Sequence, residues 1–217
     1  MVTSMAEDRR AVEELVKQAA SGNPENWEAL MKRFRTRLRR MVSFRIDPRL
    51  QGRVDPSDVV QDVCLEAWQH LAAYLKQPET TFFLWLRAVA GHKLIDLHRH
   101  HLGAQMRDAR REVSLHHGAL PGATSAALAA QLLERLNRPS EAAIKAERRL
   151  RLQTALNTMD PIDREVLALR HFEQLSVSET ACVLGIKEKA AGMRYVRALR
   201  RLKEILTGLG GWSEPCP

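Results

Sequence analysis

The chain has 217 residues, with 34 lysine and arginine residues against 26 aspartate and glutamate residues, for a formal net charge of +8. Only 5% of the residues are aromatic, and Leu, Ala, Arg and Glu prevail over strand-forming residues, which favours an all-α protein. No run approaches the roughly 20 apolar residues of a membrane span, and the charged N-terminus is unlike a signal peptide. We therefore expect a cytoplasmic protein without membrane insertion that binds an anionic partner.

The three cysteines, Cys64, Cys182 and Cys216, are odd in number and far apart. This spacing fits neither a disulfide framework nor a Cys-x-x-Cys metal site. Cys64 and Cys182 are interpreted as small core residues.

Helix starts are marked by side chains that can cap a helix. Three of them precede a proline at the first helical position, at Asn23-Pro24, Asp55-Pro56 and Asp160-Pro161, and Ser176 with Glu179 forms a capping-box pattern. No sustained alternation of period two supports a strand. Helices are predicted at about 8–21, 24–46, 56–75, 82–101, 142–158, 161–173, 177–184 and 188–207.

Turn-forming residues divide the chain. Gly103, Gly118, Pro121-Gly122 and Pro139 interrupt an Ala/Ser/Leu-rich segment without a long amphipathic stripe. We predict two small helical domains, 1–105 and 146–217, joined by a flexible linker over 106–145, in which residues 126–136 are compatible with a short helix.

Charge is arranged in three blocks. The segment from Lys32 to Arg53 contains nine basic residues and one acidic residue, for a net charge of +8. The segment from Val54 to Thr81 has a net charge of −4, and that from Lys187 to Lys203 has a net charge of +6. A single charge run is most simply a solvated helix face. Three blocks of alternating sign instead indicate two basic surfaces and one acidic surface.

The segment from Leu175 to Lys187 has the spacing of a helix-turn-helix, with a capped short helix, a small residue at Ala181 and Gly185 at the turn. In the following helix a wheel at 100° per residue places the basic residues on one side and the apolar residues on the other. The basic stripe holds Lys187, Arg194, Arg197 and Arg201; the apolar side holds Met193, Val196, Leu199, Leu202 and Leu206. This arrangement suits a recognition helix in a DNA major groove, although a basic surface helix that only aids solubility is the simpler alternative.

The helix after Asp55 has an acidic side, with Asp58, Gln61, Asp62 and Glu66 on or near one face. Negative charge cannot serve DNA binding, so a protein partner with basic residues is the sensible target. Leu65 and Trp68 on the same helix are expected in the core.

Three segments together resemble bacterial RNA polymerase sigma factors of the extracytoplasmic-function (ECF) group, which keep only regions two and four. The stretch from Leu156 to Ser176 with the helix-turn-helix resembles region four. Asp55 to Trp68 resembles the helix that docks on the polymerase clamp, and Phe82 to Arg99 resembles the helix that reads the minus-ten element and melts promoter DNA.

The resemblance implies three groups of site residues. Those for core polymerase binding are Asp55, Asp58, Gln61, Asp62 and Glu66; those for minus-ten DNA are Thr80, Thr81, Phe82, Lys93, Asp96 and Arg99; those for minus-thirty-five DNA are Lys187, Lys189, Arg194, Arg197 and Arg201. Phe83 and Trp85 are expected to be packed. The implied partners are core RNA polymerase, promoter DNA and an anti-sigma factor, which no residue here identifies.

The recognition helix departs from the family pattern Thr-Val-Lys-Ser-Arg, because the matching residues are Ala190-Ala191-Gly192-Met193-Arg194. The promoter sequence therefore cannot be carried over. Elsewhere Pro139-Ser140, Glu147 to Leu150 and Arg194 to Leu199 resemble sigma factors of planctomycete-type bacteria.

Two other functions compete with this interpretation. A two-domain transcription regulator would share the helix-turn-helix but has no need of the acidic helix. An enzyme with a metal site is suggested by His92, His98, His100 and His101, but no Cys or His-Glu-x-x-His pattern completes a site, and these histidines are interpreted as lying near phosphates. We predict no cofactor, no metal and no covalent chemistry.

Overall fold

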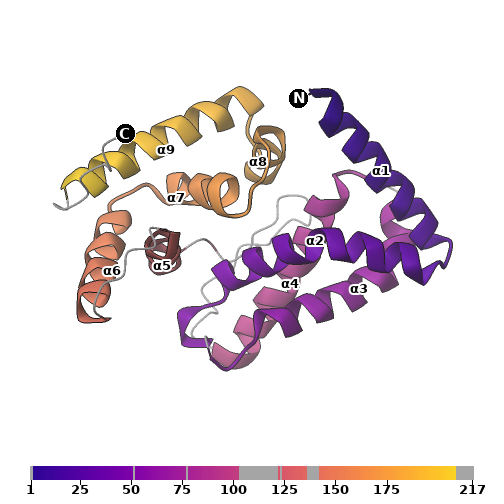
Figure 1. Cartoon of the computed structure of the whole chain (residues 1–217), viewed down its shortest axis with the longest axis horizontal. Coiled ribbons are helices and arrows are strands. Elements are labelled where there is room, and N and C mark those ends of the chain that lie inside the picture. The colour runs from indigo at the N-terminus through magenta and orange to yellow at the C-terminus, as the bar shows by residue number, and fades with distance from the viewer. Residues whose placement is uncertain are drawn as a thin grey trace. The chain divides into compact units, whose positions relative to one another are not determined.

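The computed structural model describes residues 2–50, 52–76, 78–102, 122, 124–135 and 142–208 (Figure 1). Every regular element in these ranges is a helix, so the all-α prediction is confirmed. The chain divides into two compact units, residues 1–121 and 122–217, and each is described by itself.

The N-terminal unit is a bundle in which helices adjacent in the sequence pack on one another (Figure 1). It contains α1 (Val2–Ala20), α2 (Pro24–Arg45), the short 3-10 turn η1 (Pro48–Leu50), α3 (Pro56–Lys76) and α4 (Phe82–Leu102). Helix α1 packs on α2, α2 on α3 and α3 on α4, and α2 also meets α4. The centre of the bundle is filled by completely or almost completely buried side chains, among them Leu30, Leu38, Met41, Leu71, Leu86 and Leu94.

The predicted helix starts are confirmed by their hydrogen bonds. The Asn23 side-chain oxygen accepts from the backbone N–H of Glu25 at 2.9 Å, and Asp55 Oδ1 accepts from that of Ser57 at 2.7 Å. In the C-terminal unit Asp160 Oδ1 accepts from the N–H of Ile162 at 2.8 Å. Each cap satisfies an N–H that has no partner within the helix, so these starts are determined locally.

The C-terminal unit begins with α5 (Ser125–Arg135) and α6 (Ala142–Asn157). Helix α5 lies within the segment predicted as a linker, and it packs on α6. Leu128 and Ala129 of α5 are completely buried, as are Leu152 and Leu156 of α6. Part of the segment 106–145 is therefore built into the core of this unit.

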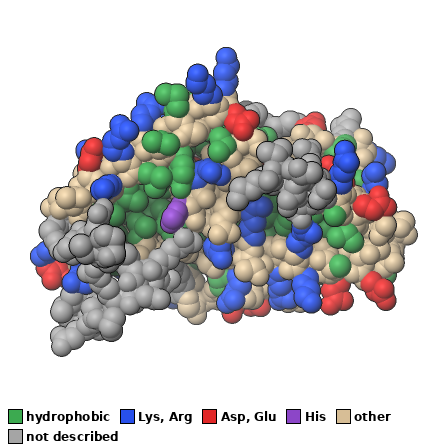
Figure 2. Space-filling view, turned by 45° about the horizontal axis from the view of Figure 1, so that its top comes forward, with side chains coloured by type: hydrophobic (Ala, Val, Ile, Leu, Met, Phe, Trp, Pro, Cys, Tyr) green, Lys and Arg blue, Asp and Glu red, His purple; other side chains and the backbone are tan. Residues whose placement is uncertain are grey.

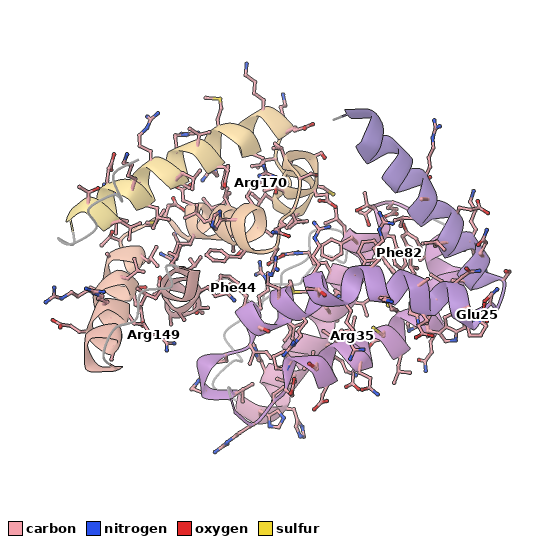
Figure 3. The ribbon with its side chains drawn as sticks, in the orientation of Figure 1. Glu25, Arg35, Phe44, Phe82, Arg149 and Arg170 are labelled. Carbon is pink, nitrogen blue, oxygen red and sulfur yellow. The ribbon has the colours of Figure 1, made fainter. Side chains whose placement is uncertain are left out.

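One helix of the C-terminal unit changes its winding. The predicted helix 161–173 forms as α7 (Pro161–Leu167) and then widens into a π-helical turn, η3 (Ala168–Phe172). Arg170 fixes the chain after this turn, because its guanidinium donates to the Leu175 carbonyl and lies over the Tyr195 ring at 5.2 Å (Figure 3). The wide turn thus leads directly into the next helix.

The helix-turn-helix forms as expected from α8 (Val177–Leu184) and α9 (Glu188–Gly208). Gly185 between them has φ +63°, a left-handed conformation that glycine adopts without strain. The capping box is complete: Ser176 Oγ accepts from the Glu179 N–H at 3.0 Å, and a Glu179 carboxylate oxygen accepts from the Ser176 N–H at 2.8 Å.

Ser176→Ala removes one half of this capping box. We expect the substitution to lower the free energy of unfolding of the C-terminal unit by about 1 kcal/mol, because the Glu179 N–H loses its acceptor. Urea denaturation monitored by circular dichroism measures the change. Thr154→Ala, at an exposed residue of α6 in the same unit, is the control and should change stability by less than about 0.5 kcal/mol.

Candidate nucleic-acid and protein interfaces

The acidic side of α3 is exposed, as predicted. Asp58, Gln61 and Asp62 are all solvent-accessible. Asp55 has a structural task in addition, because its carboxylate caps α3, and hydrogen bonding to Ser57 lowers its pKa. Unlike Asp55, the side chains of Asp58, Gln61 and Asp62 do not cap the helix, so they are accessible to a binding partner.

Two large apolar side chains share this exposed side, contrary to the expectation that they belong to the core. Leu65 is 60% exposed and Trp68 is 37% exposed. The Trp68 ring rests against Trp27 of α2, with ring centroids 5.1 Å apart. The prediction was wrong because both residues lie on the helix face occupied by Asp58 and Asp62, while Val63 and Ala67 face the core.

Lys93 of α4 forms ion pairs with acidic residues of α3. Its Nζ lies 3.4 Å from an Asp62 carboxylate oxygen and 3.9 Å from one of Glu66. The structure thus brings together one residue predicted to bind DNA and two predicted to bind polymerase. Because these groups are at least one-third exposed, the ion pairs contribute little to stability and can exchange partners readily.

At the start of α4 the polar residues are accessible to solvent and the aromatic residue is buried. Thr80 and Thr81 are partly exposed, and Thr81 Oγ1 accepts from the Leu84 N–H at 3.4 Å. Phe82 is only 4% exposed and packs against Phe34 and Tyr74 (Figure 3). Phe82 is therefore a core residue, whereas the family resemblance implied a place on the DNA-binding surface.

Asp96 and Arg99, toward the C-terminal end of α4, are open to solvent. Their side chains are 72% and 69% exposed and lie 3.7 Å apart as a surface ion pair. Phe83 is buried, as expected from the sequence, and Trp85 stacks on Tyr74 with ring centroids 4.8 Å apart.

Part of the basic block on α2 has a structural role. The Arg37 guanidinium lies 3.6 Å above the centre of the Phe83 ring, a cation–π contact, and Arg45 is only 3% exposed. Arg35, Arg39 and Arg40 retain some exposure (Figure 3 labels Arg35). The +8 block is therefore divided between the interior and the surface.

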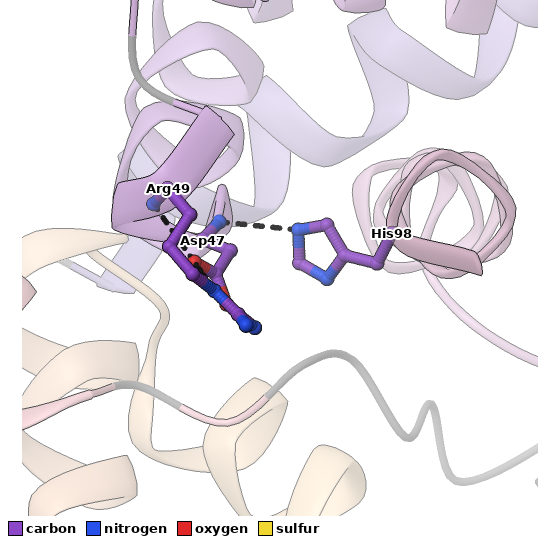
Figure 4. A network of polar contacts seen from close by, with 3 residues as sticks. All are labelled: Asp47, Arg49 and His98. Atoms are coloured by element: carbon purple, nitrogen blue, oxygen red, sulfur yellow. Dashed lines mark hydrogen bonds and ion pairs between the residues drawn. The ribbon is translucent and has the colours of Figure 1, made fainter. Parts of the chain in front are cut away.

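The histidines do not form a metal site, since the described residues contain no group of three or more potential ligands. His98 is 3% exposed, and its Nε2 accepts from the backbone N–H of Asp47 at 3.1 Å (Figure 4). Asp47 is in turn held by the Arg49 guanidinium at 3.0 Å, which lowers the pKa of the Asp47 carboxyl. His98 thus ties α4 to the turn after α2, and the interpretation that it lies near phosphates was wrong.

Stability should depend on pH through His98. Burial lowers the pKa of His98 below its usual 6.5 in the folded chain, with Asp47 opposing and Arg49 adding to the shift. The unfolded chain therefore binds more protons as the pH falls below about 6.5, so the folded state loses stability in that range. We expect the urea midpoint of unfolding to decrease when the pH is lowered from 7.5 to 5.5. In His98→Gln, whose side chain is a neutral acceptor, the urea midpoint should decrease less over the same range. Equal slopes in both proteins would contradict the neutral buried role of His98.

The cysteines fall in different environments. Cys64 is half-buried, and burial raises the pKa of its thiol. Cys182 is exposed on α8, so its interpretation as a core residue was wrong. Cys216 lies outside the described residues.

Helix α9 turns a different face to its core than the wheel predicted. The buried residues are Ala191, Ala198 and Leu202, whereas Met193, Val196 and Leu199 are 55%, 54% and 37% exposed. The prediction was right for Leu202. It failed for the three exposed residues because α9 packs on α7 and α8 largely through the small residues Ala191 and Ala198.

The basic residues of α9 consequently differ in availability. Arg194 lies beside the core and pairs with Asp163 of α7, with 3.3 Å between the charged atoms. Lys187, Lys189 and Arg197 are exposed. Arg201 is also exposed and pairs with Glu204 at 3.1 Å.

Two family models match separate parts of the chain. Residues 30–102 match the family "Sigma-70 region 2", and residues 149–202 match "Sigma-70, region 4". The ECF RNA polymerase sigma factor SigD of Mycobacterium tuberculosis is 26% identical over 97% of this chain and 91% of its own. The RNA polymerase sigma factor CnrH of Cupriavidus metallidurans is 30% identical over 88% of this chain and 92% of its own.

The chain belongs to the ECF group of the sigma-70 family. A solved structure of CnrH in complex with the cytosolic domain of CnrY has 28% identity and a TM-score of 0.52, covering 89% of this chain and 96% of that one. This sigma factor binds core RNA polymerase and promoter DNA and directs promoter-specific transcription initiation. No helix among its described residues is long and apolar enough to cross a membrane.

Proposed function

We propose that this sigma factor docks on core RNA polymerase through one face of α3, the α3 docking surface, formed by Asp58, Gln61, Asp62, Leu65 and Trp68. The observation that carries the proposal is the exposure of Leu65 and Trp68 beside the carboxylates. Protein interfaces commonly combine a buried apolar or aromatic centre with a polar rim. Basic residues on the partner would meet the acidic rim.

Asp55 and Glu66, also predicted from the resemblance, have supporting roles in this proposal. Asp55 fixes the first turn of α3 as its cap. Glu66 lies 3.9 Å from Lys93 and helps to hold that lysine against α3.

We further propose that minus-ten DNA is read by the exposed polar residues of α4 and its preceding turn, namely Thr80, Thr81, Lys93, Asp96 and Arg99. Asp96 and Arg99 can exchange their weak mutual ion pair for contacts with bases and phosphates. Lys93 becomes available when a partner replaces it at Asp62. Phe82 supports this surface from below, as part of the core.

We assign the minus-thirty-five element to α9 and the residue before it, with four exposed cations as the proposed contacts, Lys187, Lys189, Arg197 and Arg201. Arg194 acts in this proposal by fixing α9 against α7 through Asp163. We assign residues 1–105 to the polymerase-binding and minus-ten unit, 146–217 to the minus-thirty-five unit, and 106–145 to the segment that joins them, within which α5 is held on α6.

We infer that the protein acts in the cytoplasm, where its polymerase partner works, and that it catalyses no covalent reaction. The complex of CnrH with the cytosolic domain of CnrY supports an anti-sigma factor as a regulator here too. The resemblance to planctomycete-type sigma factors stays a prediction, based on the stretches Glu147 to Leu150 and Arg194 to Leu199. Pro139-Ser140, the third stretch, lies outside the described residues.

Run-off transcription with core RNA polymerase on a library of promoter sequences tests the proposed function. We expect transcripts that appear only when this protein is added and that start downstream of a shared pair of elements. A two-domain regulator would instead bind DNA in the absence of core enzyme and yield no dependent transcripts, and that outcome would refute the proposal.

A further inference from the structure

The outward face of α9 carries an exposed apolar pair within its first three turns. Met193 and Val196 are 55% and 54% exposed, while Ala191 and Ala198 on the opposite side are buried. Residues three apart lie close together on a helix surface, so the two side chains form one continuous patch. Neither is needed to fill the core of the C-terminal unit.

The surroundings of this pair are cationic. Lys189, Arg197 and Arg200 are exposed on the same side of α9, and no acidic residue occurs from Lys189 to Lys203. Figure 2 shows blue and green side chains interspersed along the upper left of the molecule, over α9. A polyanion complements such a surface, whereas a protein partner would have to supply a dense group of carboxylates.

In the DNA major groove the only apolar group on a base edge is the 5-methyl group of thymine. A helix lying there with cations on its flanks can contact phosphates with those cations and bases with its central residues. We propose that Met193 and Val196 determine sequence specificity by packing against thymine methyl groups in the minus-thirty-five element. This inference rests on the proposed function of α9.

The contact also accounts for the departure of this helix from the usual pattern. With Ala190, Ala191 and Gly192 preceding Met193, the start of α9 offers few side-chain hydrogen-bonding groups. Packing does not require glycine at position 192, since a Cβ there would make only an ordinary van der Waals contact with Val177 Cγ1 of α8, at 3.7 Å. Apolar contacts are therefore the main means by which the early part of this helix can distinguish bases.

The experiment starts from minus-thirty-five sequences selected from a random library by transcription with the reconstituted holoenzyme. Each thymine in the selected element is then replaced by deoxyuridine, which keeps base pairing and lacks only the methyl group. At one or two positions we expect the affinity of the wild-type holoenzyme to fall about three- to fivefold, the effect of removing one buried methyl-sized group. The same replacement should have no further effect on Met193→Ala or Val196→Ala at the matching position.

Leu150→Ala is the matched control, because Leu150 is 64% exposed on α6 and lies outside α9. It should retain the full deoxyuridine effect. Selected elements without thymine, or deoxyuridine effects unchanged in both α9 variants, would overturn the inference. A holoenzyme that initiates specifically but ignores thymine methyls refutes only this inference, whereas failure of any dependent initiation refutes the proposed function itself.

Discussion

Reversal of two charges, Asp58→Lys with Asp62→Lys, should lower the affinity of the full chain for core RNA polymerase at least about 100-fold. Both carboxylates are exposed on the α3 docking surface beside Leu65 and Trp68. Lysines there would face the basic residues that we propose for the partner, and like charges across an interface cost several kcal/mol. Fluorescence anisotropy of labelled protein titrated with core enzyme measures the change.

The control for this pair reverses two exposed charges elsewhere, Glu147→Lys with Glu204→Lys, and alters the net charge by the same amount. Each of these glutamates is held only by a surface ion pair, so polymerase affinity should stay within about threefold of wild type. The Asp58/Asp62 variant must also keep its melting temperature, since a lysine at position 62 approaches Lys93. Unchanged polymerase binding in a folded variant would place the docking surface elsewhere.

The second large effect concerns stability. Phe82→Ala should lower the free energy of unfolding of the N-terminal unit by about 3 to 5 kcal/mol, because the substitution opens a cavity beside Phe34, Tyr74 and Trp85. For a unit of about 100 residues this corresponds to a fall in melting temperature of roughly 12 °C or more. Differential scanning calorimetry measures it.

Phe82→Leu separates a core role from a role in DNA contact. Leucine fills most of the space, so this variant should regain most of the stability and of the promoter opening at 25 °C. If Phe82→Ala left the melting temperature unchanged and only promoter opening failed, the ring would contact DNA, as the sequence resemblance implied.

The helices could be predicted from the sequence because their signals are local. Asn23, Asp55, Asp160 and Ser176 each bond to an N–H two or three residues ahead, which requires no knowledge of the tertiary fold. The turn at Gly185 is local in the same sense. Among the proposed binding elements, these signals located α3 and the helix-turn-helix that contains α9.

The direction that side chains take was harder to predict, because it depends on packing between helices. On α9 the hydrophobic wheel favoured Met193, Val196 and Leu199 for the core, but the close approach of α7 and α8 leaves room for Ala191 and Ala198 instead. Residue size would have helped there, since small residues mark close helix contacts. On α3 the exposure of Leu65 could have been predicted from the sequence, because helical periodicity places Leu65 on the face of Asp58 and Asp62.

The order in which the helices of the N-terminal unit pack bears on how the protein folds. Each of α1, α2 and α3 packs on the helix that follows it in the sequence. Contacts between sequence neighbours need only short loops to close, and proteins rich in such contacts fold fast. We expect this unit to assemble pair by pair as the chain leaves the ribosome, so that the α3 docking surface forms soon after synthesis.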